Sequence, residues 1–127
     1  MNSDLYFYTG IASSLYALFA FGQYYTYSGV QLLSSKDAKQ KITRGNALVI
    51  DVRTQTEWNI GHFEKAKHLP TSNINEKNAT RILGKNKKRN IVVYCNTGQR
   101  ARSAAEYFKS YGYENVFYIA GTYSSLE

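Results

Sequence analysis

The sequence predicts an α/β fold in which a mainly parallel five-stranded sheet is flanked by helices and preceded by one hydrophobic helix. Residues 47–52 and 91–94 form apolar runs that only Asp51 interrupts, and such runs are typical of parallel strands buried on both faces. Helical patterns separate these runs, which indicates a parallel sheet. In a chain of 127 residues we expect one domain, residues 30–127, behind an N-terminal segment, residues 1–29.

Capping and helix-breaking residues set the boundaries of the expected elements. Ser34 and Ser35 supply N-cap hydroxyls for the first helix of the domain, and Gly45 ends it. Pro70 has no N–H to donate, so its strand can only lie at an edge of the sheet. The expected strands are residues 30–33, 47–52, 68–70, 90–94 and 116–119. The expected helices are residues 36–44, 55–60, 73–83 and 100–111.

The N-terminal segment is predicted to be a membrane anchor. No charged side chain occurs in residues 5–35. As a helix, residues 5–25 would span about 30 Å, the hydrocarbon thickness of a bilayer. Tyrosines lie near both ends of this stretch, as expected for side chains at the two membrane interfaces. We therefore expect residues 5–25 to cross a membrane once.

The charges that flank the segment predict its orientation. No Lys or Arg precedes it, and the basic residues that follow it most closely are Lys36, Lys39, Lys41 and Arg44. The positive-inside bias then places the domain on the cytoplasmic side. The alternative is export after cleavage of a signal peptide, although such a peptide would normally begin with a basic residue and this chain begins with Met1 and Asn2.

The domain is strongly basic. The chain has a net charge of +7, and all 16 Lys and Arg residues lie at or after Lys36. Such a surface favours anions, and it is also compatible with a role in solubility alone. No motif supports nucleic-acid binding. One Cys and two His without ligand spacing predict no metal site, and we expect no cofactor.

Cys95 is the only cysteine, and it lies where a predicted strand gives way to a predicted helix. A thiol in this place meets the positive end of the helix dipole and unpaired N–H donors, which together favour the thiolate. Gly98 allows the backbone to turn so that several N–H groups converge on the sulfur. Arg100 and Arg102 add positive charge nearby. These features predict a nucleophilic cysteine.

Two blocks of residues resemble the rhodanese (thiosulfate sulfurtransferase) family. The first block consists of Asp51-Val52-Arg53, Glu57-Trp58, Gly61-His62-Phe63, Ala66 and Leu69-Pro70. The second consists of Val92-Val93-Tyr94-Cys95, Gly98, Arg100, Ala104-Ala105, Gly112-Tyr113 and Asn115-Val116. Both blocks keep the order found in the family, and the likeness covers residues 30–127.

The resemblance implies a rhodanese-like fold and a sulfurtransferase. Cys95 would accept a sulfane sulfur from thiosulfate or a related small anion, become a persulfide, and pass the sulfur to a thiophilic acceptor, either a small molecule or a protein thiol. The residues whose loop amides would hold the anionic sulfur are Asn96, Thr97, Gly98, Gln99 and Arg100. The candidate supporting residues are Arg102, Asp51 and Arg53.

Two other functions remain open. One is a non-catalytic interaction module that uses the same scaffold at a membrane. The other is a phosphatase or arsenate reductase of related fold, whose loop needs one residue more than the six from Cys95 to Arg100. That extra position is Ala101, which cannot clamp an anion, so sulfur transfer is favoured. Asn96 departs from the arginine that the family often has there, which weakens the expected binding of thiosulfate.

The remaining polar residues have expected structural roles. By the resemblance, Asp51 accepts hydrogen bonds from the neighbouring loop rather than acting as a general base. Arg53 and Glu57 have the spacing of an ion pair on one helical turn. His62 fits a Cys–His nucleophile, but the resemblance implies that it fixes the chain. His68 is expected to be structural or exposed.

Overall fold

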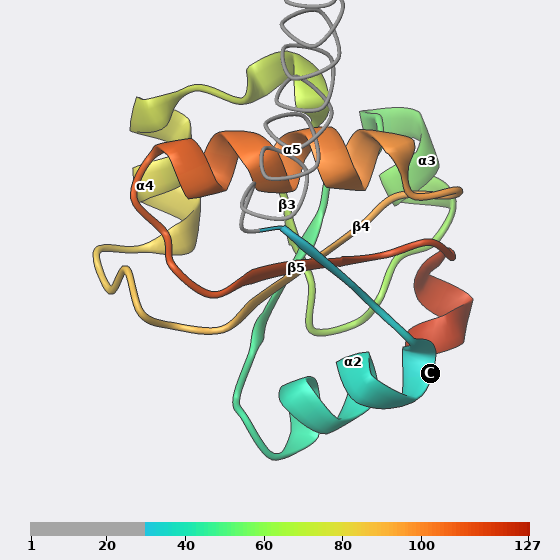
Figure 1. Cartoon of the computed structure of the whole chain (residues 1–127). Helices are drawn as coiled ribbons and strands as arrows, with labels where there is room; N and C mark the ends of the chain where they lie inside the picture. Colours follow the sequence, from blue (N-terminus) through green and yellow to red (C-terminus); the bar gives the residue numbers. More distant parts are fainter. Residues whose placement is uncertain (1–29) are drawn as a thin grey trace, which may run out of the picture.

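The computed structural model describes residues 30–127 as a parallel sheet with helices on both faces (Figure 1). The strands are β1 (Gln31–Leu33), β2 (Leu48–Asp51), β3 (Lys67–His68), β4 (Ile91–Tyr94) and β5 (Val116–Ile119). The helices are α2 (Ser35–Thr43), α3 (Gln55–Ile60), α4 (Glu76–Leu83) and α5 (Gln99–Ser110). Two 3₁₀ turns occupy Thr71–Asn73 and Tyr123–Leu126.

The sheet has five strands in the order β1-β5-β4-β2-β3, and every neighbouring pair is parallel. The predicted five-stranded parallel sheet is therefore confirmed. The register pairs Asp51 at the end of β2 with Tyr94 at the end of β4. Since all strands run in the same direction, the last residues of β2 and β4 meet at one edge of the sheet, where parallel α/β sheets form their sites.

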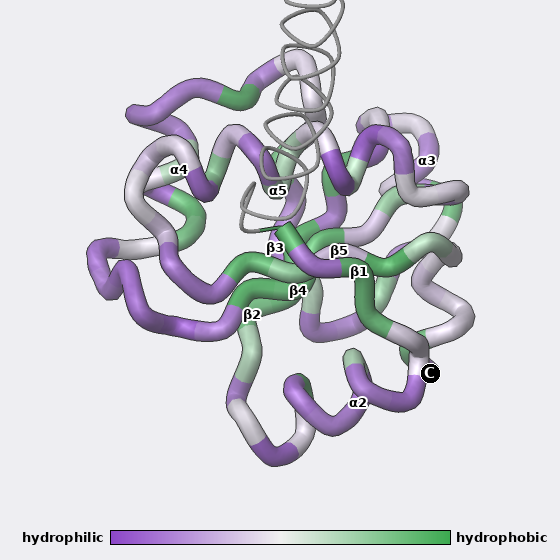
Figure 2. Tube along the Cα trace, viewed as in Figure 1, coloured by the Kyte–Doolittle hydropathy of each residue, from purple (hydrophilic) through white to green (hydrophobic). Residues whose placement is uncertain are grey.

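Each face of the sheet has its own hydrophobic core. Ile50 and Val93 point into the core covered by α4 and α5, while Val49 and Val92 point into the core covered by α2. This alternation follows from the two-residue period of a strand. It explains why both strands read as continuous apolar runs, because both of their faces are buried. Figure 2 shows the hydrophobic colour gathered on these central strands.

Side chains just before α2 and α3 cap the first turns of these helices. Ser34 caps α2 as predicted, and its Oγ accepts a hydrogen bond of 3.1 Å from the N–H of Asp37. Thr54 begins α3 with a capping box, in which Thr54 and Glu57 each accept a hydrogen bond from the other's main-chain N–H. The capping box satisfies donors that the short helix leaves unpaired at its start.

Two expected elements differ in their bounds. β3 ends at His68, before Pro70, although it is an edge strand as predicted. The helix expected over residues 73–83 begins only at Glu76, because Asn75 is its N-cap and accepts the N–H of Asn78, while Asn73 ends the preceding 3₁₀ turn. The turn at Tyr123–Leu126 was not expected, and its Leu126 is buried in the core beneath α2.

The predicted membrane anchor, residues 5–25, lies within residues 1–29 and so outside the described part of the chain. From residue 30 onward, no helix is both long enough and apolar enough to cross a bilayer.

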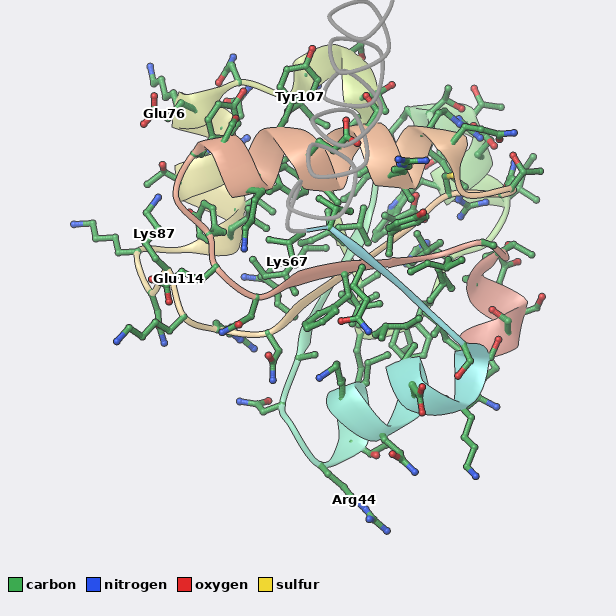
Figure 3. The ribbon with its side chains drawn as sticks, in the orientation of Figure 1. Arg44, Lys67, Glu76, Lys87, Tyr107 and Glu114 are labelled. Atoms are coloured by element: carbon green, nitrogen blue, oxygen red, sulfur yellow. The ribbon has the colours of Figure 1, made fainter. Side chains whose placement is uncertain are left out.

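Truncation of Phe108 should destabilise the domain strongly. Phe108 is fully buried between α5 and the sheet, so Phe108→Ala should lower the free energy of unfolding by about 3–5 kcal/mol. Tyr107 is the matched control, because it is 55% exposed on the outer side of α5 (Figure 3), and Tyr107→Ala should cost less than about 1 kcal/mol. Urea unfolding followed by the fluorescence of Trp58 measures both changes. Equal losses would contradict the assigned packing of α5.

Candidate active site

Cys95 lies at the carboxyl edge of the sheet, directly after β4. Residues 95–98 make the turn from β4 to α5, and Gly98 is the N-cap of that helix. The side chain is almost completely shielded, since Cys95 is 1% exposed. A reagent therefore reaches the sulfur only when the groups above it move.

Two main-chain N–H groups donate to the sulfur of Cys95. The N–H of Gly98 lies 3.1 Å from Sγ and that of Ala101 lies 3.4 Å from it. Gly98 is the N-cap of α5 and Ala101 lies in its first turn, and the helix itself provides no acceptor for the N–H groups at its start. Such donors favour an anionic sulfur. Gly98 is within the predicted amide set of residues 96–100, whereas Ala101 is one residue beyond it.

Gly98 is required by both conformation and contact. Its φ of 100° is rare for residues with a side chain. A Cβ at this position would lie 3.0 Å from Cα of Ala120 and 3.4 Å from the carbonyl oxygen of Ile119. The loop thus packs directly against the end of β5, and this contact aims the N–H of Gly98 at the sulfur.

Glu57 bridges the loop from the side of α3. Its carboxylate accepts two hydrogen bonds from the guanidinium of Arg100, at 2.8 and 3.1 Å, and one of 2.6 Å from the amide of Asn96. The backbone N–H and the hydroxyl of Thr54 donate to the same carboxylate. These donors, Arg100 first, hold the pKa of Glu57 well below its usual range. The side chain is therefore a permanent anion beside the loop.

The predicted ion pair between Arg53 and Glu57 is wrong. Arg53 lies before the helix, because Thr54 is the N-cap of α3, so the spacing rule for one helical turn does not apply. Its guanidinium instead pairs with Asp51, with a shortest contact of 2.8 Å, and donates to the carbonyl of Gly61 at 2.6 Å.

Asp51, Arg53 and Tyr94 form a buried polar network. The hydroxyl of Tyr94 donates to Asp51 at 2.6 Å and accepts the N–H of Phe63 at 3.0 Å. Burial, and then the contact with Asp51, raises the pKa of Tyr94. The donors to Asp51 are thus Arg53 and Tyr94, not the loop of residues 96–100. Removing one partner of such a buried pair costs about 3–5 kcal/mol, so this network is a structural support of the edge.

The two histidines pack on Trp58. The ring of His62 stacks on the indole at 3.4 Å between centroids and that of His68 at 4.7 Å. One ring nitrogen of His62 bonds the carbonyl of Trp58 at 2.9 Å, and one of His68 bonds the carbonyl of Arg53 at 2.7 Å. These contacts fix the chain around α3, in line with the structural role that the resemblance implied.

The other predicted loop residues are at the surface. Thr97 and Gln99 are exposed and hydrogen bond to each other. Arg102 lies one turn into α5, and its guanidinium is 3.4 Å from the carboxylate of Glu106. In the described residues, no group of three or more His, Cys, Asp or Glu side chains could hold a metal ion.

Two hollows lie at the opposite edge of the sheet from Cys95. They have volumes of about 510 and 470 Å³, and Gly45 and Asn90 line both of them. Neither contains Cys95 or any other residue of its loop. The thiol with its hydrogen-bond donors, rather than either of these hollows, marks the candidate site.

Comparison with known proteins finds the same kind of domain that the sequence resembles. A family model described as the rhodanese-like domain matches residues 34–127. The tRNA uridine(34) hydroxylase of Photorhabdus laumondii is 31% identical over 93 residues, which are 72% of this chain and 26% of that protein. The enzyme of the same name from Buchnera aphidicola is 33% identical over 91 residues, 70% of this chain and 29% of that protein. The chain thus spans less than a third of the length of these curated relatives.

Solved structures show the same fold at lower identity. A rhodanese-like domain from Anabaena superposes with a TM-score of 0.63 at 24% identity, covering 75% of this chain and 71% of the other. The human single-domain sulfurtransferase gives a TM-score of 0.60 at 21% identity, covering 74% and 92%. A persulfide form of EanB with ergothioneine gives 0.61 at 24% identity, covering 71% and 24%.

A side chain at Gly98 should disturb the loop more than one at Gly84. Both glycines have positive φ, but a Cβ at Gly84 meets nothing within 4 Å. Gly84→Ala should therefore cost only the backbone strain, about 1–3 kcal/mol, whereas Gly98→Ala adds the collision with Ala120. Urea unfolding should show a larger loss for Gly98→Ala, and Cys95 should become more reactive towards iodoacetamide in that variant alone. Equal losses with unchanged reactivity would show that the loop does not depend on this contact.

Proposed function

The chain belongs to the rhodanese-like family, and we propose that it is a sulfurtransferase that carries a sulfane sulfur as a persulfide on Cys95. The observation on which the proposal rests is the pair of N–H groups, from Gly98 and Ala101, directed at the buried Sγ. The human relative is named a sulfurtransferase and the EanB structure contains a persulfide, which supports this chemistry for the fold.

The proposed reaction is a double displacement. The thiolate of Cys95 attacks the outer sulfur of thiosulfate or a related donor, the donor's S–S bond breaks, and sulfite or the corresponding anion leaves. A thiophilic acceptor then attacks the outer sulfur of the persulfide and regenerates the thiolate. The N–H groups of Gly98 and Ala101 stabilise the anionic sulfur throughout the cycle. Burial of Cys95 keeps water away from the persulfide between the two steps.

Two other readings have weaker support. An interaction module would not need N–H groups aimed at a thiol. A phosphatase or arsenate reductase would need a basic residue free to clamp an oxyanion, whereas Arg100 is bound to Glu57 on both nitrogens. The relatives named tRNA uridine(34) hydroxylases match over less than a third of their length. Their RNA substrate therefore has no support from the residues of this chain.

Incubation with a sulfane-sulfur donor should add one sulfur atom to the protein. The chain has a single cysteine, so intact-mass spectrometry assigns the added sulfur to Cys95 without peptide mapping. Cyanide should remove the sulfur and release thiocyanate. Cys95→Ser is the matched control and should gain nothing. A wild-type protein that gains no sulfur from either thiosulfate or a persulfide, or a Cys95→Ser protein that does, would refute the proposed activity.

The second part of the proposal is that residues 5–25 tether the domain to a membrane, with the domain on the cytoplasmic side. The absence of charge in residues 5–35 supports the tether, and the basic residues from Lys36 onward support the orientation. The full chain expressed in cells should remain with the membrane after alkaline carbonate extraction, whereas residues 30–127 alone should not. Protease added outside sealed cells should leave the domain intact. Release of a shortened domain into the medium would instead indicate cleavage and export.

A further inference from the structure

The three arginines singled out from the sequence as possible members of the site are each paired with a carboxylate. In the described part of the chain there are three ion pairs, and each of them binds one of these arginines to a carboxylate. The pairs are Arg53–Asp51, Arg100–Glu57 and Arg102–Glu106. The positive charge that the sequence concentrates around the loop is therefore cancelled locally, despite the net charge of +7.

Glu57 holds the side-chain donors of the loop that an anionic sulfur donor could use. Arg100 is the only cationic residue among residues 96–100, and both of its terminal nitrogens donate to the Glu57 carboxylate. Asn96, at the other end of the loop, donates to that carboxylate as well. The carboxylate thus links the two ends of the loop, and an incoming anion that binds Arg100 or Asn96 competes with it for these donors.

Protonation does not relieve this competition near neutral pH. The hydrogen bonds from Arg100, Thr54 and Asn96 keep the pKa of Glu57 below its usual range, so the carboxylate stays charged. Other basic residues lie away from Cys95. Lys85, Lys88 and Arg89 line the hollow at the opposite edge of the sheet, and Arg44 extends away from the end of α2 (Figure 3).

We propose that Glu57 is a specificity-determining residue: by holding Arg100 and Asn96 it disfavours dianionic donors such as thiosulfate, and the site takes its sulfur from a persulfide, R–S–SH. This inference rests on the proposed function, because it names the donor class for the same cysteine. A persulfide is neutral or singly charged at its reacting end, so it reaches the sulfur without needing an unpaired arginine. Repulsion by a fixed carboxylate is strongest for a dianion.

The transfer from a persulfide balances without a further reactant. The thiolate of Cys95 attacks the outer sulfur of R–S–SH, the S–S bond of the donor breaks, and its electron pair leaves with R–S⁻. The products are Cys95–S–SH and the donor thiolate, so the proton stays on the transferred sulfur. The N–H groups of Gly98 and Ala101 face the Cys95 sulfur before the reaction, and no cation is required to bind the leaving group.

Glu57→Gln removes the negative charge and keeps the size of the side chain. Glutamine can still complete a capping box at this position of a helix, and its carbonyl oxygen can still accept from Thr54 and from one nitrogen of Arg100, as Oε1 does. Its amide nitrogen cannot accept the hydrogen bonds that Oε2 takes from Asn96 and from the other nitrogen of Arg100, so the variant also releases these two donors. Glu76→Gln is the matched control, because it removes one negative charge from the first turn of α4, on the other side of the molecule from α3 (Figures 1 and 3).

The test compares thiosulfate with ethyl persulfide, whose organic group carries no charge, as donors to the full chain. The wild type should have the higher kcat/KM with ethyl persulfide. Glu57→Gln should raise kcat/KM for thiosulfate by about tenfold, mainly through KM, and should change the persulfide value much less. The gain should shrink as the ionic strength rises, a response that a purely structural role would not produce. Glu76→Gln should leave both donors unchanged.

Each outcome decides between the proposals. Preference of the wild type for thiosulfate would overturn the inference and leave the sulfurtransferase proposal standing, and this result needs no variant. A thiosulfate rate that Glu57→Gln leaves unchanged or lowers, in protein whose Trp58 fluorescence is native, would also overturn it. Transfer to Cys95 from neither donor would refute the proposed function itself.

Discussion

Two main-chain N–H groups at the start of α5, those of Gly98 and Ala101, point at the sulfur of Cys95 from 3.1 and 3.4 Å. Their position depends on the rest of the fold. β4 is buried on both faces and ends at Tyr94, which fixes where the loop begins. The buried face of α5, which includes Ala101, fixes where the loop ends. Gly98 then joins the two through a backbone conformation that few other residues adopt, in contact with Ala120. Sheet, helix and turn together place these donors around one thiol.

A second set of interactions connects the end of β2, through α3, to the loop after Cys95. Asp51 at the end of β2 binds Arg53, and Arg53 binds the carbonyl of Gly61 beyond α3. Tyr94 joins the same network from β4. These contacts hold both ends of α3 close to the carboxyl edge, and α3 carries Glu57 to Arg100 and Asn96. The buried network thus determines which charge faces the loop, although none of its members contacts the sulfur.

Much of the fold could be predicted from local pattern, because each signal had a local cause. The runs that became β2 and β4, the Ser34 cap and Gly45 after α2 depend only on neighbouring residues. The loop after Cys95 could be predicted for the same reason. The start of α4 was predicted too early, because the helical pattern of the sequence begins before Asn75, whose side chain caps the helix. The pairing of Arg53 with Glu57 was wrong because the helical spacing rule was applied across the N-cap Thr54.

The ion pair of Glu57 with Arg100 joins residues 43 positions apart, so no local rule could find it. The only signal in the sequence was the capping box, in which Thr54 and Glu57 have the spacing of a helix start. That spacing places Glu57 on the first turn of α3 but does not reveal what it faces. The sequence therefore indicated a basic site, whereas in the structure Arg53, Arg100 and Arg102 are each paired with a carboxylate.

The most direct measurement of the central claim is the response of individual main-chain amides to sulfur loading, recorded by ¹H–¹⁵N NMR before and after addition of a persulfide donor. If Sγ accepts hydrogen bonds from Gly98 and Ala101 and is the atom that receives the sulfur, the signals of these two amides should shift most, and Cys95→Ser should show no shift. Signals of Gly98 and Ala101 that stay in place while the protein gains a sulfur atom would contradict the account.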